Sequence, residues 1–148
     1  MAEKLKEADE LIGELARLIV FILLALFLCY AGFNYYRSNK FSSEFEEIYE
    51  LMSQKTNLRQ YCNEGSGGAA RSSPTVFLWL DMIGSRASAY SHAKYAQSAE
   101  SASKAFEASG DIQAASEAKS EAEKRWEVSF RRYLDSLCAE LERKRRSY

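Results

Sequence analysis

Residues 18–33 read LIVFILLALFLCYAGF, an apolar run of sixteen residues that points to a lipid bilayer. At about 1.5 Å per residue the run covers roughly 24 Å, less than the roughly 30 Å hydrocarbon core of a bilayer. Apolar residues within 11–16 extend it upstream, and Tyr35 and Tyr36 supply aromatic side chains for the interface at its other end. We therefore predict a membrane-spanning helix over residues 11–36.

Two other structures fit an apolar run of this length, namely a signal peptide that is removed and a buried core helix. The polar tail over residues 1–10 is acidic as well as basic, unlike the basic start of a signal peptide. The bulky Phe33, Tyr35 and Tyr36 stand where a cleavage site needs small residues. The pattern therefore favours a retained span.

The basic residues beside the span set the expected topology, because cytoplasmic flanks carry the excess of Lys and Arg. Three precede the apolar run 18–33 and two follow it, and they are Lys4, Lys6, Arg17, Arg37 and Lys40. This small excess places the N-terminal tail in the cytoplasm and the larger C-terminal domain on the non-cytoplasmic side.

The region after the span is nearly neutral, with 17 Lys and Arg against 16 Asp and Glu over residues 37–148. It therefore offers no overall field for nucleic acid. Residues 63–73 are rich in Gly and Ser and predict a linker. Their GSGG sequence lacks the Gly-Lys-Ser/Thr that a phosphate-binding loop needs.

Residues 37–62 predict a short amphipathic helical arm. Ser43 and Glu46 have the spacing of a capping box, so we expect a separate helix start there. The membrane helix is then expected to bend or break between Arg37 and Ser42. The apolar residues expected on one face of the arm are Phe41, Phe45, Ile48, Met52, Leu58 and Cys62.

Residues 74–148 predict a long antiparallel helical hairpin that resembles a coiled coil. Ser73 suits the N-cap and Pro74 the first helical position. Gly110 suits a left-handed helix end and Asp111 the next N-cap, which places the turn at residues 109–111. With the span and the arm, this gives an all-α fold class.

A contact surface is expected at one end of the hairpin. Residues 76–83 are apolar nearly all round a helix, and folding back about Gly110 brings the basic residues 143–146 beside their start. The short arm, a partner subunit or the lipid surface are the alternatives for covering this segment. The predicted contact residues are Val76, Phe77, Trp79, Leu80, Met82, Ile83, Arg143, Lys144, Arg145 and Arg146.

Catalytic chemistry is not expected. His92 is the only histidine and lies in a plain helical sequence. A metal site from His92, Cys62 and Cys138 would need three distant points without any Cys-x-x-Cys pair. We predict no enzyme activity, no catalytic or metal-binding residue, no cofactor and no small-molecule substrate. Whether Cys62 and Cys138 form a disulfide is left open, since that depends on the compartment.

These features predict a non-catalytic single-pass membrane subunit that packs on larger subunits of a membrane complex, its hairpin acting as a brace or docking element. The alternative is a self-associating membrane-tethered effector. Such an effector would act alone or as a homo-oligomer, and the layout of a short tail, one span and a helical outer region resembles the inner-membrane spanin proteins of phage lysis systems. The partners expected are therefore larger subunits or further copies of the chain, together with the lipid bilayer.

Overall fold

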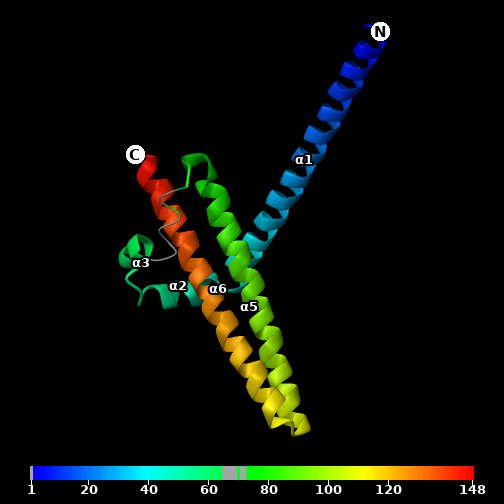
Figure 1. The fold of residues 1–148 in the computed structure, drawn as a ribbon. Helices are drawn as coiled ribbons and strands as arrows, with labels where there is room; N and C mark the ends of the chain where they lie inside the picture. Colours follow the sequence, from blue (N-terminus) through cyan, green and yellow to red (C-terminus); the bar gives the residue numbers. More distant parts are fainter. Residues whose placement is uncertain (1, 65–69, 71–72) are drawn as a thin grey trace. The chain divides into compact units, whose positions relative to one another are not determined.

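The structure, a computed structural model, describes residues 2–64, 70 and 73–148, and these residues are mostly helical with no strand among them. The all-α prediction is therefore confirmed. In chain order the elements are α1 (Ala2–Glu44), α2 (Glu46–Ser53), α3 (Leu58–Glu64), the 3₁₀ turn η2 (Thr75–Phe77), α5 (Leu78–Ser109) and α6 (Ile112–Arg146) (Figure 1). Most of the predicted linker, residues 65–69 and 71–72, lies outside the described residues.

The chain divides into two compact units, residues 1–33 and residues 34–148. The first is the N-terminal part of α1, and the second, called the body below, contains the end of α1 and all later elements. The body therefore begins within a helix, not after a loop.

The expected break between Arg37 and Ser42 is wrong, because α1 continues to Glu44. Ser43 is no N-cap, since its hydroxyl donates to the carbonyl oxygen of Lys40 at 2.9 Å, within the same helix. Residues 34–44 contain no Gly or Pro that would end a helix. The bend comes at Phe45, which has φ −130° and separates α1 from α2.

The region predicted as one arm is divided into the end of α1, α2 and α3. Its buried face also differs from the prediction, because Ile48 and Met52 are exposed and Tyr49 is buried in their place. Phe41, Phe45 and Tyr49 are four residues apart, and this spacing puts their side chains on one stripe. That stripe faces α5 and α6.

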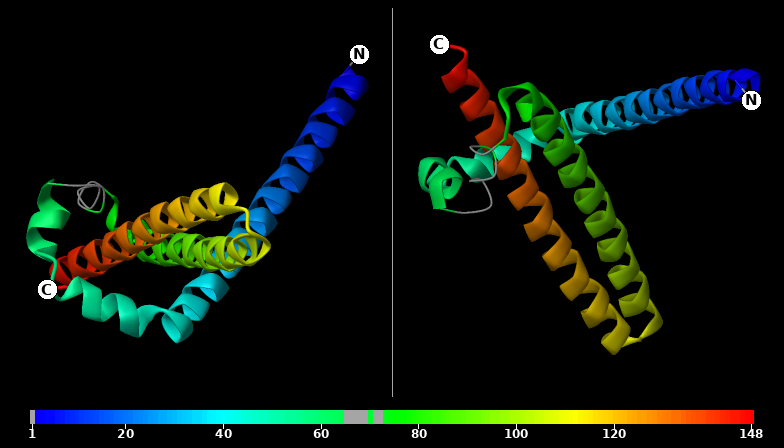
Figure 2. Two further views of the ribbon diagram at one scale, coloured as in Figure 1. Left: turned by 90° about the horizontal axis from the view of Figure 1, so that it is seen from below. Right: turned by 45° about the horizontal axis from the view of Figure 1, so that its top comes forward.

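The helices α5 and α6 lie side by side along their length (Figure 2). Between them Gly110 has φ 83°, a left-handed conformation that suits glycine, and the N–H of Asp111 donates to the carbonyl of Phe106 at 3.0 Å. The Asp111 carboxylate accepts from the N–H of Ala114 at 3.1 Å, which caps α6. The helix start was expected at Ser73 and Pro74, but Pro74 instead precedes η2, and α5 begins at Leu78.

Small residues fill the space between α5 and α6. Ala89, Ala93 and Ala96 of α5 and Ala115 and Ala122 of α6 are all buried. Small side chains let two helices approach closely, but each buries little apolar area. The pair therefore depends on additional packing for its stability.

That packing comes from an aromatic core, in which the end of α1 and α2 fit against both long helices. The Phe41 ring lies 5.2 Å from Tyr49 and 5.4 Å from Tyr133 between centroids, and Phe41 is fully buried. These distances suit favourable aromatic pairs. The aromatic core consists of Phe41, Phe45, Tyr49, Tyr90, Trp126, Phe130 and Tyr133, packed around Ala89 and Ala93.

Polar contacts fix the position of this core. The Tyr49 hydroxyl donates to Ser129 Oγ at 2.8 Å, and Ser129 donates to the carbonyl of Ala89 at 2.6 Å, which joins α2, α6 and α5. Arg86 of α5 pairs with Glu46 of α2 at 3.3 Å and with Glu140 of α6 at 3.4 Å. Two sets of interactions thus join the same three helices, namely hydrogen bonds between hydroxyl groups and a backbone carbonyl, and the ion pairs of Arg86.

Replacing Phe41 by Ala should destabilise the body strongly, since a fully buried phenyl ring is lost from the centre of the aromatic core. We expect a loss of about 3–5 kcal/mol in the free energy of unfolding. Urea unfolding of the full chain in mild detergent, followed by near-ultraviolet circular dichroism, measures it. Ile48→Ala is the control, because Ile48 is 57% exposed and should change stability by no more than about 0.5 kcal/mol. Equal losses in the two variants would contradict the assigned core.

Candidate functional site

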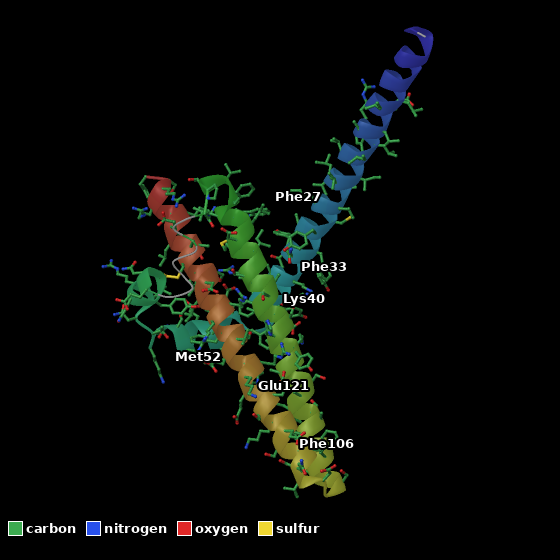
Figure 3. All side chains as sticks on the ribbon, viewed as in Figure 1. Phe27, Phe33, Lys40, Met52, Phe106 and Glu121 are labelled. Atoms are coloured by element: carbon green, nitrogen blue, oxygen red, sulfur yellow. A yellow bond between two sulfur atoms is a disulfide. The ribbon has the colours of Figure 1, made fainter. Side chains whose placement is uncertain are left out.

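Residues 18–33 of α1 present apolar side chains on all sides. Figure 3 shows them projecting around the whole helix, and Val20, Phe21 and Leu23 are 64%, 68% and 60% exposed. The segment Leu11–Glu44 is long and apolar enough to cross a membrane, and none of its most apolar stretch is buried within the chain. The most apolar stretch of α1 is therefore not covered by other residues of this chain.

The predicted contact segment, residues 76–83, is divided between the interior and the surface. Leu78 and Ile83 are buried, and Met82 packs against a small cluster beneath α3. Val76 remains 82% exposed and Trp79 44% exposed, and Phe77 lies between these values. The body thus covers one side of the segment, while Val76, Phe77 and Trp79 stay exposed on the surface of the body.

The basic residues at the end of α6 lie against the start of this segment. Arg146 donates to the carbonyl oxygen of Ser73 at 2.9 Å and to Thr75 Oγ1 at 3.0 Å. Lys144 pairs with Glu140 at 2.9 Å. The structure therefore brings the apolar and the basic predicted contact residues to one end of the α5–α6 pair.

Glu142 lies beneath the basic residues and is 6% exposed. Arg145 donates to both of its carboxylate oxygens at 2.8 and 2.9 Å, and Arg146 donates at 2.6 Å. These hydrogen bonds to Arg145 and Arg146 lower the pKa of Glu142 to about 2, against the smaller opposing effect of burial. The carboxylate therefore stays ionised and holds two arginines at the helix end.

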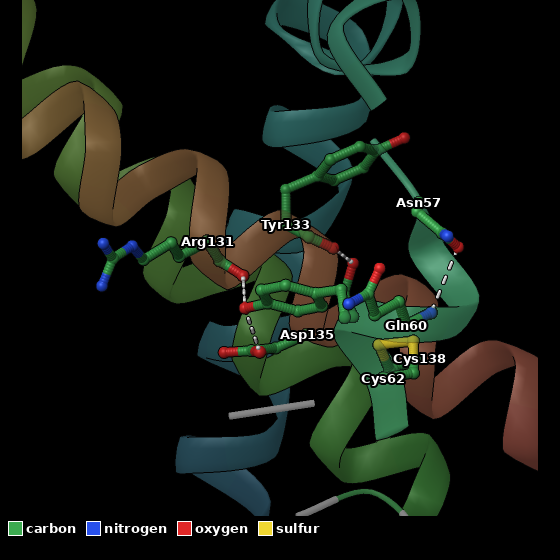
Figure 4. Close-up of a disulfide and its surroundings, with 9 residues drawn as sticks. Asn57, Gln60, Cys62, Arg131, Tyr133, Asp135 and Cys138 are labelled. Atoms are coloured by element: carbon green, nitrogen blue, oxygen red, sulfur yellow. Dashed lines mark hydrogen bonds between the residues drawn. A yellow bond between two sulfur atoms is a disulfide. The ribbon is translucent and has the colours of Figure 1, made fainter. Parts of the chain in front are cut away.

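A disulfide joins Cys62 of α3 to Cys138 of α6, with 5.5 Å between their Cα atoms (Figure 4). Beside it the Tyr61 hydroxyl donates to the Asp135 carboxylate at 2.9 Å. Leu58, Ala70, Met82 and Ala139 pack around the bond. Composition alone did not decide whether the two cysteines pair. They are 76 residues apart in the sequence, and the pairing requires α3 to pack against the C-terminal part of α6.

His92 lies on α5 with its Nδ1 3.4 Å from Nη1 of Arg125. Burial lowers its pKa, and the positive charges of Arg125 and Arg132 lower it further. Cys62 and Cys138 are bonded to each other, so they are not thiolates available to a metal beside this histidine. Within the described part of the chain, no three His, Cys, Asp or Glu side chains are grouped to hold a metal ion.

A second exposed apolar surface was missed by the sequence reasoning. On α2, Ile48, Leu51 and Met52 are 57%, 59% and 46% exposed, although Ile48 and Met52 were assigned to the buried face. The four-residue spacing of Phe41, Phe45 and Tyr49 could have revealed the true buried stripe. We call Ile48, Leu51 and Met52 the α2 face.

No protein-family model matches this chain, and no curated protein and no solved structure matches it. What the chain does is therefore inferred from its own residues and their arrangement.

Because of the ion pairs of Glu142, the thermal stability of the body should fall at acidic pH. A folded-state pKa of about 2 lies below the ordinary value of about 4.3, so the stabilisation is complete above about pH 5 and is lost as pH falls towards about 2. Thermal unfolding across this range should show a steeper loss in the original chain than in Glu142→Gln, which cannot titrate. Glu107→Gln, at an exposed position, is the control and should keep the original slope. An unchanged slope in Glu142→Gln would refute the assignment.

Proposed function

We propose that this chain is a non-catalytic single-pass membrane subunit that docks on larger subunits of a membrane protein complex, with the α5–α6 pair as a brace. The observation that carries the proposal is an exposed apolar helix continuous with a body that has its own aromatic core. The first feature suits an anchor, and the second suits a rigid binding element.

The anchor proposal is supported by the length and surface of α1. Residues 11–36 span about 39 Å as a helix, enough for the roughly 30 Å hydrocarbon core. A helix satisfies its own backbone hydrogen bonds, so apolar side chains on every side suit lipid. In water, each exposed large apolar side chain would forgo about 1.5–3 kcal/mol of burial energy. Bulky residues at Phe33, Tyr35 and Tyr36 disfavour cleavage as a signal peptide.

The docking proposal is supported by the α2 face. Three large apolar side chains stand exposed on a helix of eight residues, whose Tyr49 is fixed in the aromatic core. Exposed apolar residues on a rigidly held element are typical of protein interfaces. We therefore assign the α2 face to a protein partner.

The disulfide supports a non-cytoplasmic body. Disulfides persist in oxidising compartments and are rare in the cytosol. A disulfide at Cys62 and Cys138 thus agrees with the topology expected from the basic flanks, with the N-terminal tail in the cytoplasm and the body on the other side.

Trapping thiols at the moment of cell lysis tests this topology. We expect an alkylating reagent to modify only Cys29 in the denatured, unreduced chain, and all three cysteines after reduction, as counted by intact mass. Cys62→Ser is the control, because it frees Cys138 and should give two modified cysteines without reduction. Three modified cysteines in the unreduced original chain would place the body in a reducing compartment.

Gentle detergent extraction followed by native mass measurement tests the docking function. We expect larger, unrelated subunits to accompany the chain in fixed ratio, and Leu51→Glu to lose them because a carboxylate would be placed in an apolar interface. Ser98→Glu introduces the same charge at an exposed position of α5 and should keep them. Recovery of the chain only as an oligomer of itself would favour the self-associating effector instead.

A further inference from the structure

The end of the α5–α6 pair that combines apolar and basic residues has no role in the docking proposal. Its apolar part consists of Val76, Phe77 and Trp79, which are exposed by 82%, 49% and 44%. Its basic part is the last turn of α6, residues 143–146. We call these two groups together the basic–apolar end. The bonds from Arg146 to Ser73 and Thr75 hold the groups together.

Two of the four cations at this end, Lys144 and Arg145, face outward, whereas the Arg146 side chain is only 23% exposed. The side chains of Lys144 and Arg145 are 61% and 73% exposed, whereas their partners Glu140 and Glu142 are only 25% and 7% exposed. The carboxylates thus lie beneath the cations and position them. Three carboxylates, those of Glu140, Glu142 and Asp81, stand against the four cations of residues 143–146, and all three are buried or partly buried. An approaching surface therefore meets positive charge beside exposed Phe and Trp side chains.

We infer that the basic–apolar end docks on an anionic lipid surface. Trp and Phe insert at the boundary between headgroups and acyl chains, while neighbouring Lys and Arg pair with lipid phosphates. Apolar side chains alone would suit a protein equally well. The outward cations beside them favour anionic lipid, since each contributes about fivefold to binding near such a surface.

The inference rests on the proposed membrane anchoring, because a chain held in a bilayer meets lipid headgroups at a high effective concentration. Under that condition, weak contacts from three apolar side chains and a few cations suffice for docking. A body docked at this end would be restrained in its orientation, as a brace requires.

Quenching of Trp79 fluorescence by lipids with brominated acyl chains tests the inference in the full chain reconstituted into vesicles. Trp79→Phe keeps an apolar ring and leaves only Trp126, so the difference between the original chain and this variant reports Trp79 alone. We expect strong quenching of Trp79 when phosphatidylglycerol is mixed with phosphatidylcholine. In phosphatidylcholine alone we expect at most half of that quenching.

Two charge variants test whether the cations of the basic–apolar end cause the binding to anionic lipid. The double variant Arg143→Gln and Lys144→Gln should lose at least half of the quenching in anionic vesicles. Lys104→Gln with Lys119→Gln removes two exposed cations far along the same helix pair and should leave it unchanged. Circular dichroism of each variant checks that the helices are intact.

The docking inference is overturned if Trp79 is not quenched in anionic vesicles, or if quenching is equal in both lipids and in both charge variants. Protection of Trp79 by a co-purified protein subunit instead of lipid overturns it as well. Failure of the anchoring proposal looks different, because the chain would then be washed from the vesicles by alkaline carbonate.

Discussion

The packing of Phe41, Phe45 and Tyr49 against α5 and α6 is the interaction on which the body depends. The two long helices meet through alanine and serine, and such an interface brings their axes close without burying much apolar area. The aromatic rings supply the missing area from one side. Their position is then fixed by the hydrogen bonds of Tyr49 and Ser129 and by the charges around Arg86.

This packing also determines where α1 ends. A helix that supplied only a membrane anchor would be free to stop after its aromatic flank, yet α1 runs on to Glu44 and contributes Phe41 to the core. Glu44 pairs with Lys94 of α5, which secures the last turn of α1 on the body. In the proposed function, the anchor and the docking element would share residues of one helix.

The disulfide joins α3 to α6 nearer the C-terminal end of α6 and affects which residues are exposed there. By holding α3 on α6, it covers Met82, whereas Val76, Phe77 and Trp79 lie beyond its reach and stay exposed. Glu142 then holds Arg145 and Arg146 in the last turn of α6. The two proposed contact surfaces are the α2 face and the basic–apolar end. Both consist of apolar residues, with cations at the second, that the packing of the body leaves exposed.

The sequence by itself determined the all-helical class, the apolar N-terminal helix and the residues of the turn at Gly110 and Asp111, because these follow from local composition, periodicity and backbone preference. It misplaced the helix break and assigned Ile48 and Met52 to a buried face, and it left the pairing of Cys62 and Cys138 open. These features depend on contacts between residues far apart in the chain. Ser43 suits an N-cap as well as a helix interior, and only the burial of Phe41 and Tyr49 against Tyr133 decides between them. Likewise, Leu78 and Trp79 are adjacent, large and mainly apolar, and only the tertiary packing buries the first and leaves the second exposed.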